Sequence, residues 1–202
     1  MRITPLAESI LPASGRLDAL VADVWLRIVR GLDGQWPPWS LPTLATVAAG
    51  GPRARILALR AADAATRTFT FHGDARSQKS REIAADPRAC VVFWDPTDGI
   101  EARFTGQALL RRGDAVSDRA WANVSALRRH ASRSAEAPGA HLSGPTRFDA
   151  MPLSAEHDGR ENFVVIEVHV DNLDWLWVGA DDMRRATFAW TGPAWTGTWT
   201  IP

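Results

Sequence analysis

Residues 43–60 read TLATVAAGGPRARILALR, and this stretch determines the fold class that the sequence predicts. Two apolar segments, 43–49 and 54–60, flank the turn-forming triplet Gly50-Gly51-Pro52. Two short apolar segments around such a turn are typical of a β-hairpin. We therefore expect an antiparallel sheet to begin here.

Further strands and helices are predicted by the same patterns. Apolar residues recur at three- and four-residue spacing between Leu17 and Val29, which predicts a helix that ends near Gly31 or Gly34. The other predicted strands are 68–72, 88–95, 100–111, 162–170, 173–178, 184–190 and 195–201, and the other predicted helices are 77–85 and 114–129. Successive strands joined by tight turns favour a mainly β, antiparallel barrel with flanking helices over a parallel α/β sheet.

Length and composition suit one domain. The chain has 202 residues, of which 46% are hydrophobic and 23% charged, so it can bury a substantial core. We expect a single domain over 1–202, with a helix and extended arm in 1–40 and a mobile loop in 131–151. The formal net charge is zero, so we expect neither a nucleic-acid nor a membrane partner.

Cysteine and histidine patterns argue against disulfide and metal chemistry. Cys90 is the only cysteine and lies in an apolar run, so we expect it to pack in the interior. The five histidines form no closely spaced pair, so no metal site is predicted. The N-terminus lacks a basic region followed by a long apolar stretch, and a cytoplasmic location is therefore expected.

Positively charged residues gather around a predicted helix start. In the segment Asp74-Ala75-Arg76-Ser77-Gln78-Lys79, a helix N-terminus is combined with two cations and a hydroxyl group, an arrangement suited to a phosphate. Strand alternation places Arg55 and Arg60 on opposite faces of the preceding strand. The alternative is that Ser77 only caps the helix and that the basic side chains are solvated.

Taken in order along the chain, these segments resemble the pyridoxamine 5′-phosphate oxidase family and its relatives. In that family a strand motif Arg-x-x-x-x-Lys grips the phosphate of FMN, and Arg55 and Arg60 occupy its two positions. Lys79 matches the phosphate-binding lysine of the helix start that follows. Leu176-Trp177-Val178-Gly179 is similar to the family's Phe-Trp-x-Gly, whose tryptophan lies beside the flavin.

The resemblance implies an FMN-binding split β-barrel that works as a homodimer, with FMN at the interface between the subunits. Trp177 would border the flavin from the partner chain, and His72 would lie near the flavin edge. The residues expected to bind FMN are Arg55, Ile56, Leu57, Arg60, His72, Arg76, Ser77, Lys79 and Trp177.

The chain departs from the family at positions near the flavin and the substrate. Glu101 stands where the family commonly has a glutamine, and Thr187 where it has an arginine. Met183 and Arg185 replace the oxidase's substrate-binding arginine and histidine. The predicted function is therefore an FMN-dependent oxidoreductase acting on another small molecule, with no catalytic side chain assigned. The alternatives are a flavin-binding or flavin-sensing protein without turnover and a true pyridoxamine 5′-phosphate oxidase.

Overall fold

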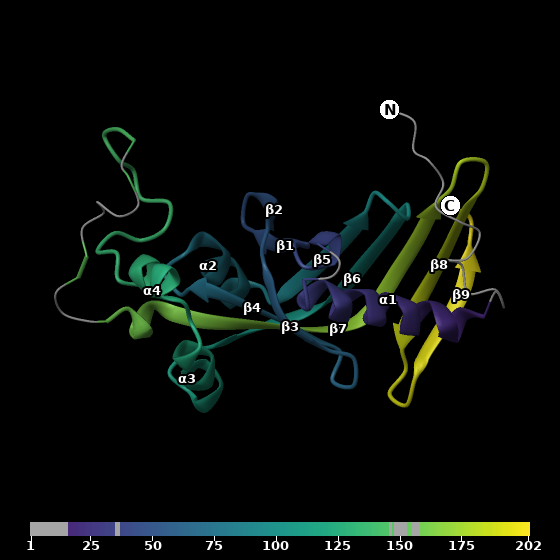
Figure 1. Cartoon of the computed structure of the whole chain (residues 1–202), viewed down its shortest axis with the longest axis horizontal. Helices are drawn as coiled ribbons and strands as arrows, with labels where there is room; N and C mark the ends of the chain where they lie inside the picture. The colour runs from purple at the N-terminus through teal and green to yellow at the C-terminus, as the bar shows by residue number, and fades with distance from the viewer. Residues whose placement is uncertain (1–15, 35–36, 146, 148–152, 155–157) are drawn as a thin grey trace.

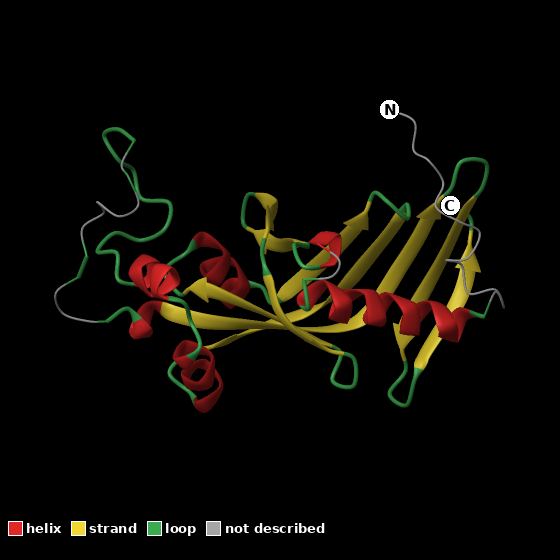
Figure 2. Ribbon diagram, in the orientation of Figure 1, coloured by secondary structure: helices red, strands yellow, loops and turns green. Residues whose placement is uncertain are grey.

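The computed structural model describes residues 16–34, 37–145, 147, 153–154 and 158–202. Within them, nine strands form one antiparallel sheet in the order β2-β1-β5-β6-β7-β4-β3, with β8 beside β7 and β9 beside β8 (Figures 1 and 2). The sheet does not close on itself. The expected mainly β fold with flanking helices is confirmed.

The elements follow one another in the predicted order. The helices are α1 (Leu17–Leu32), α2 (Gln78–Ala85), α3 (Ala115–Ala122) and α4 (Ala126–Ser132), with short 3₁₀ turns η1 (Pro37–Trp39) and η3 (Arg160–Asn162). The strands are β1 (Thr43–Ala48), β2 (Gly51–Ile56), β3 (Leu59–Asp63), β4 (Thr68–Asp74), β5 (Arg88–Asp95), β6 (Ile100–Arg111), β7 (Phe163–Val178), β8 (Met183–Trp190) and β9 (Trp195–Thr200).

The predicted hairpin at the start of the sheet is present, but its second strand is divided. Thr43 pairs with Ile56 and Ala48 with Gly51, so β1 and β2 flank the Gly-Gly turn. The chain then bends at Leu57, whose amide donates to the carbonyl of Pro42. As a result, β3 starts only at Leu59. The prediction of one continuous strand over 54–60 is therefore wrong.

The two strands predicted over 162–170 and 173–178 are one continuous strand, β7. It pairs with β6 along almost its whole length, with β4 over its first half and with β8 over its second half. The register with β6 shifts between Thr105 and Gly106. This bulge accommodates the polar residues Asp171 and Asn172, which the sequence suggested were a break.

The helix predicted over 114–129 is also divided. Asp114 caps α3 by accepting from the amides of Val116 and Ser117, as a capping residue should. α3 ends at Ala122, and α4 begins anew after Ser125. Residues 146 and 148–151 of the loop predicted at 131–151 lie outside the described residues, and its mobility stays a prediction.

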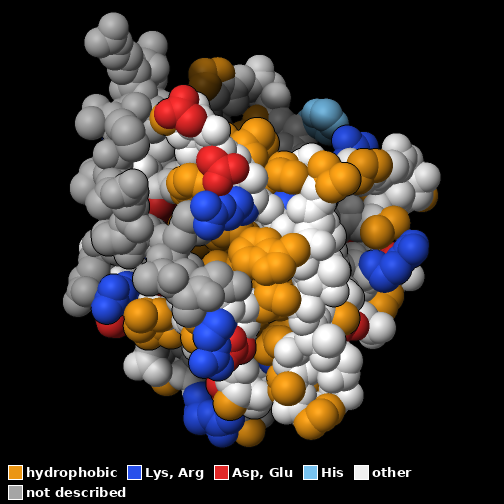
Figure 3. All heavy atoms as spheres, turned by 90° about the vertical axis from the view of Figure 1, so that its right-hand side faces the viewer, with side chains coloured by type: hydrophobic (Ala, Val, Ile, Leu, Met, Phe, Trp, Pro, Cys, Tyr) orange, Lys and Arg blue, Asp and Glu red, His pale blue; other side chains and the backbone are white. Residues whose placement is uncertain are grey.

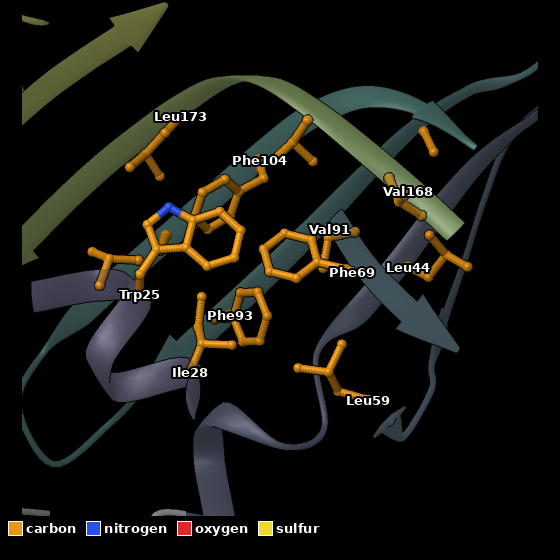
Figure 4. Close-up of a cluster of buried hydrophobic side chains, with 14 of the residues drawn as sticks. Trp25, Ile28, Leu44, Leu59, Phe69, Val91, Phe93, Phe104, Val168 and Leu173 are labelled. Carbon is orange, nitrogen blue, oxygen red and sulfur yellow. The ribbon is translucent and has the colours of Figure 1, made fainter. Parts of the chain in front are cut away.

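Helix α1 covers one face of the sheet, and its apolar stripe fills the main core (Figure 4). Val24 and Ile28 are fully buried, and the Trp25 ring stacks on Phe69 at 5.0 Å between ring centroids. Phe69 also meets Phe104 edge-on at 5.0 Å. Such aromatic pairs stabilise a core beyond their buried area.

A charged residue of α1 fastens the helix to the turn between β5 and β6. Arg27 is only 5% exposed, and its guanidinium donates to Asp23 at 2.6 Å and to Asp98 at 2.5 Å. Trp39 donates to the neighbouring buried carboxylate of Asp95 at 2.9 Å. The helix position is thus fixed by directed bonds as well as by apolar packing.

A second, smaller core lies on the other face of β7. Trp121 and Val124 pack there against Phe163 and Val165, which alternate with main-core residues along the strand. Helices α3 and α4 therefore cover the β4 end of the molecule (Figure 2). No helix in the described ranges is both long enough and apolar enough to span a bilayer.

Candidate functional site

The helix start predicted to bind an anion forms directly after β4. Asp74 ends β4, and Ser77 precedes the first turn of α2 in an extended conformation. A side chain at Gly73 would approach the Cε atom of Lys79 to 3.2 Å. The glycine thus leaves room for the lysine stem against the strand.

Arg55, Ser77 and Lys79 gather on this side of the sheet, and we call them the cradle. Lys79 Nζ donates to Ser77 Oγ at 3.2 Å. Burial, followed by repulsion from Arg55, lowers the pKa of Lys79 below its ordinary value. Two cations held together away from water are electrostatically unfavourable unless an anion joins them.

The carboxylate of Glu82 lies beside the cradle, and that of Asp74, which is paired with Arg76, also acts on Lys79. Arg55 Nη2 donates to Glu82 Oε2 at 2.7 Å, while its Nη1 donates to Thr46 Oγ1 at 2.6 Å. Glu82 balances one of the two positive charges, so the cradle keeps net positive charge beside the N-terminus of α2. Its donors are a guanidinium, an ammonium and a hydroxyl, which fit the phosphate group of FMN.

Arg76 does not join the cradle. Its guanidinium binds Asp74 at 2.8 Å through Nη2 and the carbonyl of Ser134 at 2.9 Å through Nη1. These bonds tie the segment after α4 to the end of β4. Arg76 therefore holds the surrounding loops in place in this structure.

Arg60 and His72 lie on the opposite face of β4, together with a residue that the sequence did not suggest. His72 points to the same face as Phe163 and meets its ring edge-on at 4.9 Å, whereas Gly73 faces Lys79. Arg128 of α4 approaches both Arg60 and His72 closely enough to affect the pKa of each. We call Arg60, His72 and Arg128 the arginine–histidine pocket.

The charges from the described chain that act on Arg60 and His72 in this pocket are all positive, and none comes from a carboxylate. Burial, then the charges of Arg60 and Arg128, lower the pKa of His72 to about 4. Burial and Arg128 likewise lower the pKa of Arg60. Within the described residues, the buried atoms Arg60 Nε and His72 Nδ1 have no hydrogen-bond partner. Unpaired buried polar atoms are costly, and the Arg60 Nε–H in particular fits an acceptor from a ligand.

A cavity of about 170 Å³ opens beside His72. Its walls include Val124, Arg128 and Ser132, which follow one another at intervals of four residues. Arg128 and Ser132 lie four residues apart on α4 and so share one face, whereas Val124 lies in the break between α3 and α4. The spacing of Arg128 and Ser132 is the sequence feature that would have pointed to Arg128. The continuous helix predicted over 114–129 ended too early to include Ser132.

The remaining predicted residues occupy two different places. Ile56 is 69% exposed and Leu57 half-buried, and both lie at the bend between β2 and β3. Trp177 is remote, because it lies fourteen residues beyond Phe163, the partner of Asp74. At about 3.3 Å per residue, that is roughly 45 Å along β7. The chain does not bring its own Trp177 to its own cradle.

Close to Trp177 in the sheet, but on the opposite face, which points away from α1, lies a charged cluster. Asp174 accepts from Arg185 through both carboxylate oxygens, at 2.9 and 2.6 Å, and from Arg103. Arg103 also lies 3.9 Å from Glu101. The negative charge of Glu101 is thus compensated in part by a neighbouring arginine. At this end of the molecule, hydrophobic side chains gather between charged ones (Figure 3).

A second, larger hollow of about 530 Å³ lies on strands β1, β5 and β6. Its lining includes Ala45, Val47, Cys90 and Thr105. Cys90 is half-buried rather than fully buried, and burial raises the pKa of its thiol. This hollow is therefore mainly a shallow apolar area of the sheet surface.

Comparison with known proteins places these features in context. Residues 40–174 match a family described as pyridoxamine 5′-phosphate oxidase. A pyridoxine/pyridoxamine 5′-phosphate oxidase from Burkholderia mallei is 41% identical over 73 residues, which are 36% of this chain and 32% of that protein. Another from Granulibacter bethesdensis is 37% identical over 89 residues, covering 42% of this chain and 41% of the relative. The chain thus matches less than half the length of these curated relatives.

Two solved structures share the fold over nearly the whole chain. A pyridoxamine 5′-phosphate oxidase-related, FMN binding protein from Nostoc punctiforme superposes with a TM-score of 0.68 at 21% identity, covering 98% of this chain and 100% of its own. PhzG from Burkholderia lata, in complex with tetrahydrophenazine-1-carboxylic acid, gives 0.71 at 19% identity, covering 99% of each chain. At these identities the likeness establishes the fold.

Proposed function

Because this chain belongs to the pyridoxamine 5′-phosphate oxidase family, we propose that it is an FMN-binding flavoprotein that oxidises or reduces a small, negatively charged molecule. The observation that carries the proposal is the cradle, where the half-buried cations Arg55 and Lys79 lie beside a helix N-terminus. A phosphate dianion relieves the repulsion between these two cations. When bound, FMN supplies the hydride or electron transfer, and the protein binds and orients the reactants.

Arg55, Ser77 and Lys79 are the residues that would hold the phosphate. Ile56 and Leu57, at the bend between β2 and β3, lie next in the chain and offer backbone groups and an apolar surface to the flavin. Arg60, which the family motif also assigns to FMN, belongs by position to the arginine–histidine pocket.

The arginine–histidine pocket supports a negatively charged substrate. Arg128 and the neutral imidazole of His72 line a cavity of about 170 Å³, and the charge of Arg60 acts on both side chains; a cavity of this size suits one anionic group rather than a whole molecule. The pocket and the cradle lie on opposite faces of the same strand, β4. A ligand group in one and the FMN phosphate in the other are thereby kept apart.

We also propose that the active unit is a homodimer. Trp177 lies roughly 45 Å along β7 from Phe163, which pairs with Asp74 just before Ser77 and Lys79, so we expect a flavin bound at those two residues to meet the tryptophan of a second copy. The charged cluster at Arg103, Asp174 and Arg185 lies on a sheet face that no helix of the described chain covers. Light scattering of the purified protein should give about twice the mass of one chain.

The cofactor proposal is tested by comparing FMN with riboflavin, which lacks the phosphate. Quenching of flavin fluorescence gives both affinities for the wild type and for the double variant Arg55→Ala/Lys79→Ala. We expect a loss of about a hundredfold or more for FMN, since two charge-assisted interactions are removed, and little change for riboflavin. Arg119→Ala, which removes an exposed arginine of α3 away from the cradle, is the matched control. Equal losses for both flavins, or none, would contradict the assignment.

A further inference from the structure

The carboxylate of Glu82 is an unexpected neighbour for a phosphate. The residue is only 6% exposed, and its charge opposes that of an incoming anion. Burying a carboxylate costs several kcal/mol unless it is well paired. Its position directly beside Arg55 therefore needs an explanation.

Glu82 is held by two donors at the same oxygen. Oε2 accepts from Thr46 Oγ1 at 2.6 Å and from Arg55 Nη2 at 2.7 Å. Burial alone would raise the pKa of Glu82, but these hydrogen bonds and the Arg55 charge hold it below its usual value. Glu82 is thus ionised at neutral pH.

The same contacts fix the Arg55 guanidinium on one edge. Its Nη1 donates to Thr46 Oγ1 at 2.6 Å and reaches the carbonyl of Leu44 at 3.3 Å, while Nη2 is bound to Glu82. Thr46 is 3% exposed, so this support is a rigid, buried one. A long arginine side chain otherwise loses considerable rotamer entropy when it is ordered by a ligand.

We infer that Glu82 is a positioning residue of the cradle, which orders Arg55 before the phosphate arrives. This inference rests on the proposed FMN function. It has a counter-intuitive consequence, because Glu82→Gln removes a negative charge from an anion site and yet weakens anion binding. A purely electrostatic role of Glu82 predicts the opposite, since loss of a like charge strengthens the attraction between the cradle and a phosphate.

The test measures FMN and riboflavin affinities for Glu82→Gln by fluorescence quenching. We expect FMN affinity to fall about tenfold, the factor that corresponds to one ordered charge-assisted interaction, with riboflavin affinity unchanged. Glu167→Gln is the matched control, because Glu167 also faces an arginine, Arg111, at 3.6 Å but lies away from the cradle. Tighter FMN binding by Glu82→Gln would overturn the inference.

A second variant separates positioning from charge. Thr46→Val removes the hydroxyl that supports both Arg55 and Glu82 without altering any charge. Thr46→Val should also lower the affinity for FMN but not for riboflavin. It tests the same inference if the Glu82→Gln variant does not fold. FMN affinity unchanged in Thr46→Val would likewise overturn the inference. If the wild type itself binds FMN no better than riboflavin, the proposed function fails instead.

Discussion

Arg60 of β3 and Arg128 of α4 place two like charges beside one imidazole, that of His72. Arg60 and Arg128 are 68 residues apart in the sequence, so only the fold brings the two guanidinium groups near each other. Arg60 and His72 are half-buried and Arg128 is exposed, so solvent screens part of this repulsion, and the remainder lowers the stability of the ligand-free fold.

Inorganic phosphate should therefore stabilise the protein through this pocket. We expect the melting temperature to rise with phosphate concentration, since a ligand at a hundred times its dissociation constant adds about 2.7 kcal/mol. Arg128→Gln should melt at the same temperature as the wild type or higher without phosphate, and should lose part of the rise. Arg119→Gln, an exposed arginine of α3, should keep the full rise. A lower melting point for Arg128→Gln in phosphate-free buffer would argue against charge repulsion.

His72 should make the fold sensitive to mild acid. Its pKa is about 4 in the folded chain against an ordinary 6.5, so the unfolded state binds a proton first as the pH falls. The free energy of unfolding should thus decrease from about pH 6.5 towards pH 4, by at most about 1 kcal/mol per pH unit after solvent screening. Carboxyl groups such as Asp86, with a pKa of about 2, add their losses only at lower pH.

The measurement is urea unfolding at intervals between pH 7 and pH 4.5. His72→Gln should flatten the profile over this window, while His141→Gln, an exposed histidine, should leave it as in the wild type. A profile with the same slope in His72→Gln would show that other groups cause it.

The ion pairs of Arg27 should be among the most important for stability. Arg27→Met leaves Asp98, which is 8% exposed, without its charge partner. Loss of one member of a buried pair typically costs about 3–5 kcal/mol. Arg16→Met removes the exposed Arg16–Asp18 pair and should leave the melting temperature unchanged. Restored stability in the double variant Arg27→Met/Asp98→Asn would identify the orphaned carboxylate as the cause.

Gly106 should tolerate no side chain. A Cβ atom there would lie 2.0 Å from the carbonyl oxygen of His169 and 2.7 Å from Cα of Val170. Gly106→Ala must displace backbone at the bulge, and we expect a loss of about 2–4 kcal/mol in the free energy of unfolding. A Cβ atom at Gly50 meets open space, so Gly50→Ala should change the free energy of unfolding by no more than about 0.5 kcal/mol. Equal denaturant midpoints for the two variants would contradict this reading of the bulge.

The sequence predicted the elements that local patterns define. The Gly50-Gly51 turn, the apolar stripe of α1 and the start of α2 all depend on neighbouring residues. The division between Ile56 and Leu59 was missed because it depends on pairing of Leu57 with Pro42, a contact of the folded chain. The single strand β7 was missed because polar residues at a bulge look like a turn.

In the candidate site, too, the residues of short local motifs could be predicted and those brought together by the fold could not. Ser77 and Lys79 lie within one short motif, and the family resemblance added Arg55. Alternation already put Arg60 on the other face from Arg55, and the structure gives that face its own cluster. Arg128 comes from a distant helix, so only the fold brings it to His72.

Strand β7 has a consequence for the order in which the chain folds. Strand β7 pairs with β4, β6 and β8, and its first half separates β4 from β6 in the sheet. The earlier strands β4 and β6 therefore cannot complete their hydrogen bonds until residue 178 has left the ribosome. At about 5–20 residues per second, the N-terminal half waits several seconds with exposed strand edges. The β4–β7 and β6–β7 pairings are thus made late and over long sequence separations, whereas β1–β2, β3–β4 and β5–β6 are local hairpins; long-range pairings of this kind slow folding. During synthesis, the β4–β6 gap is the place where a chaperone or a second nascent chain has the longest access.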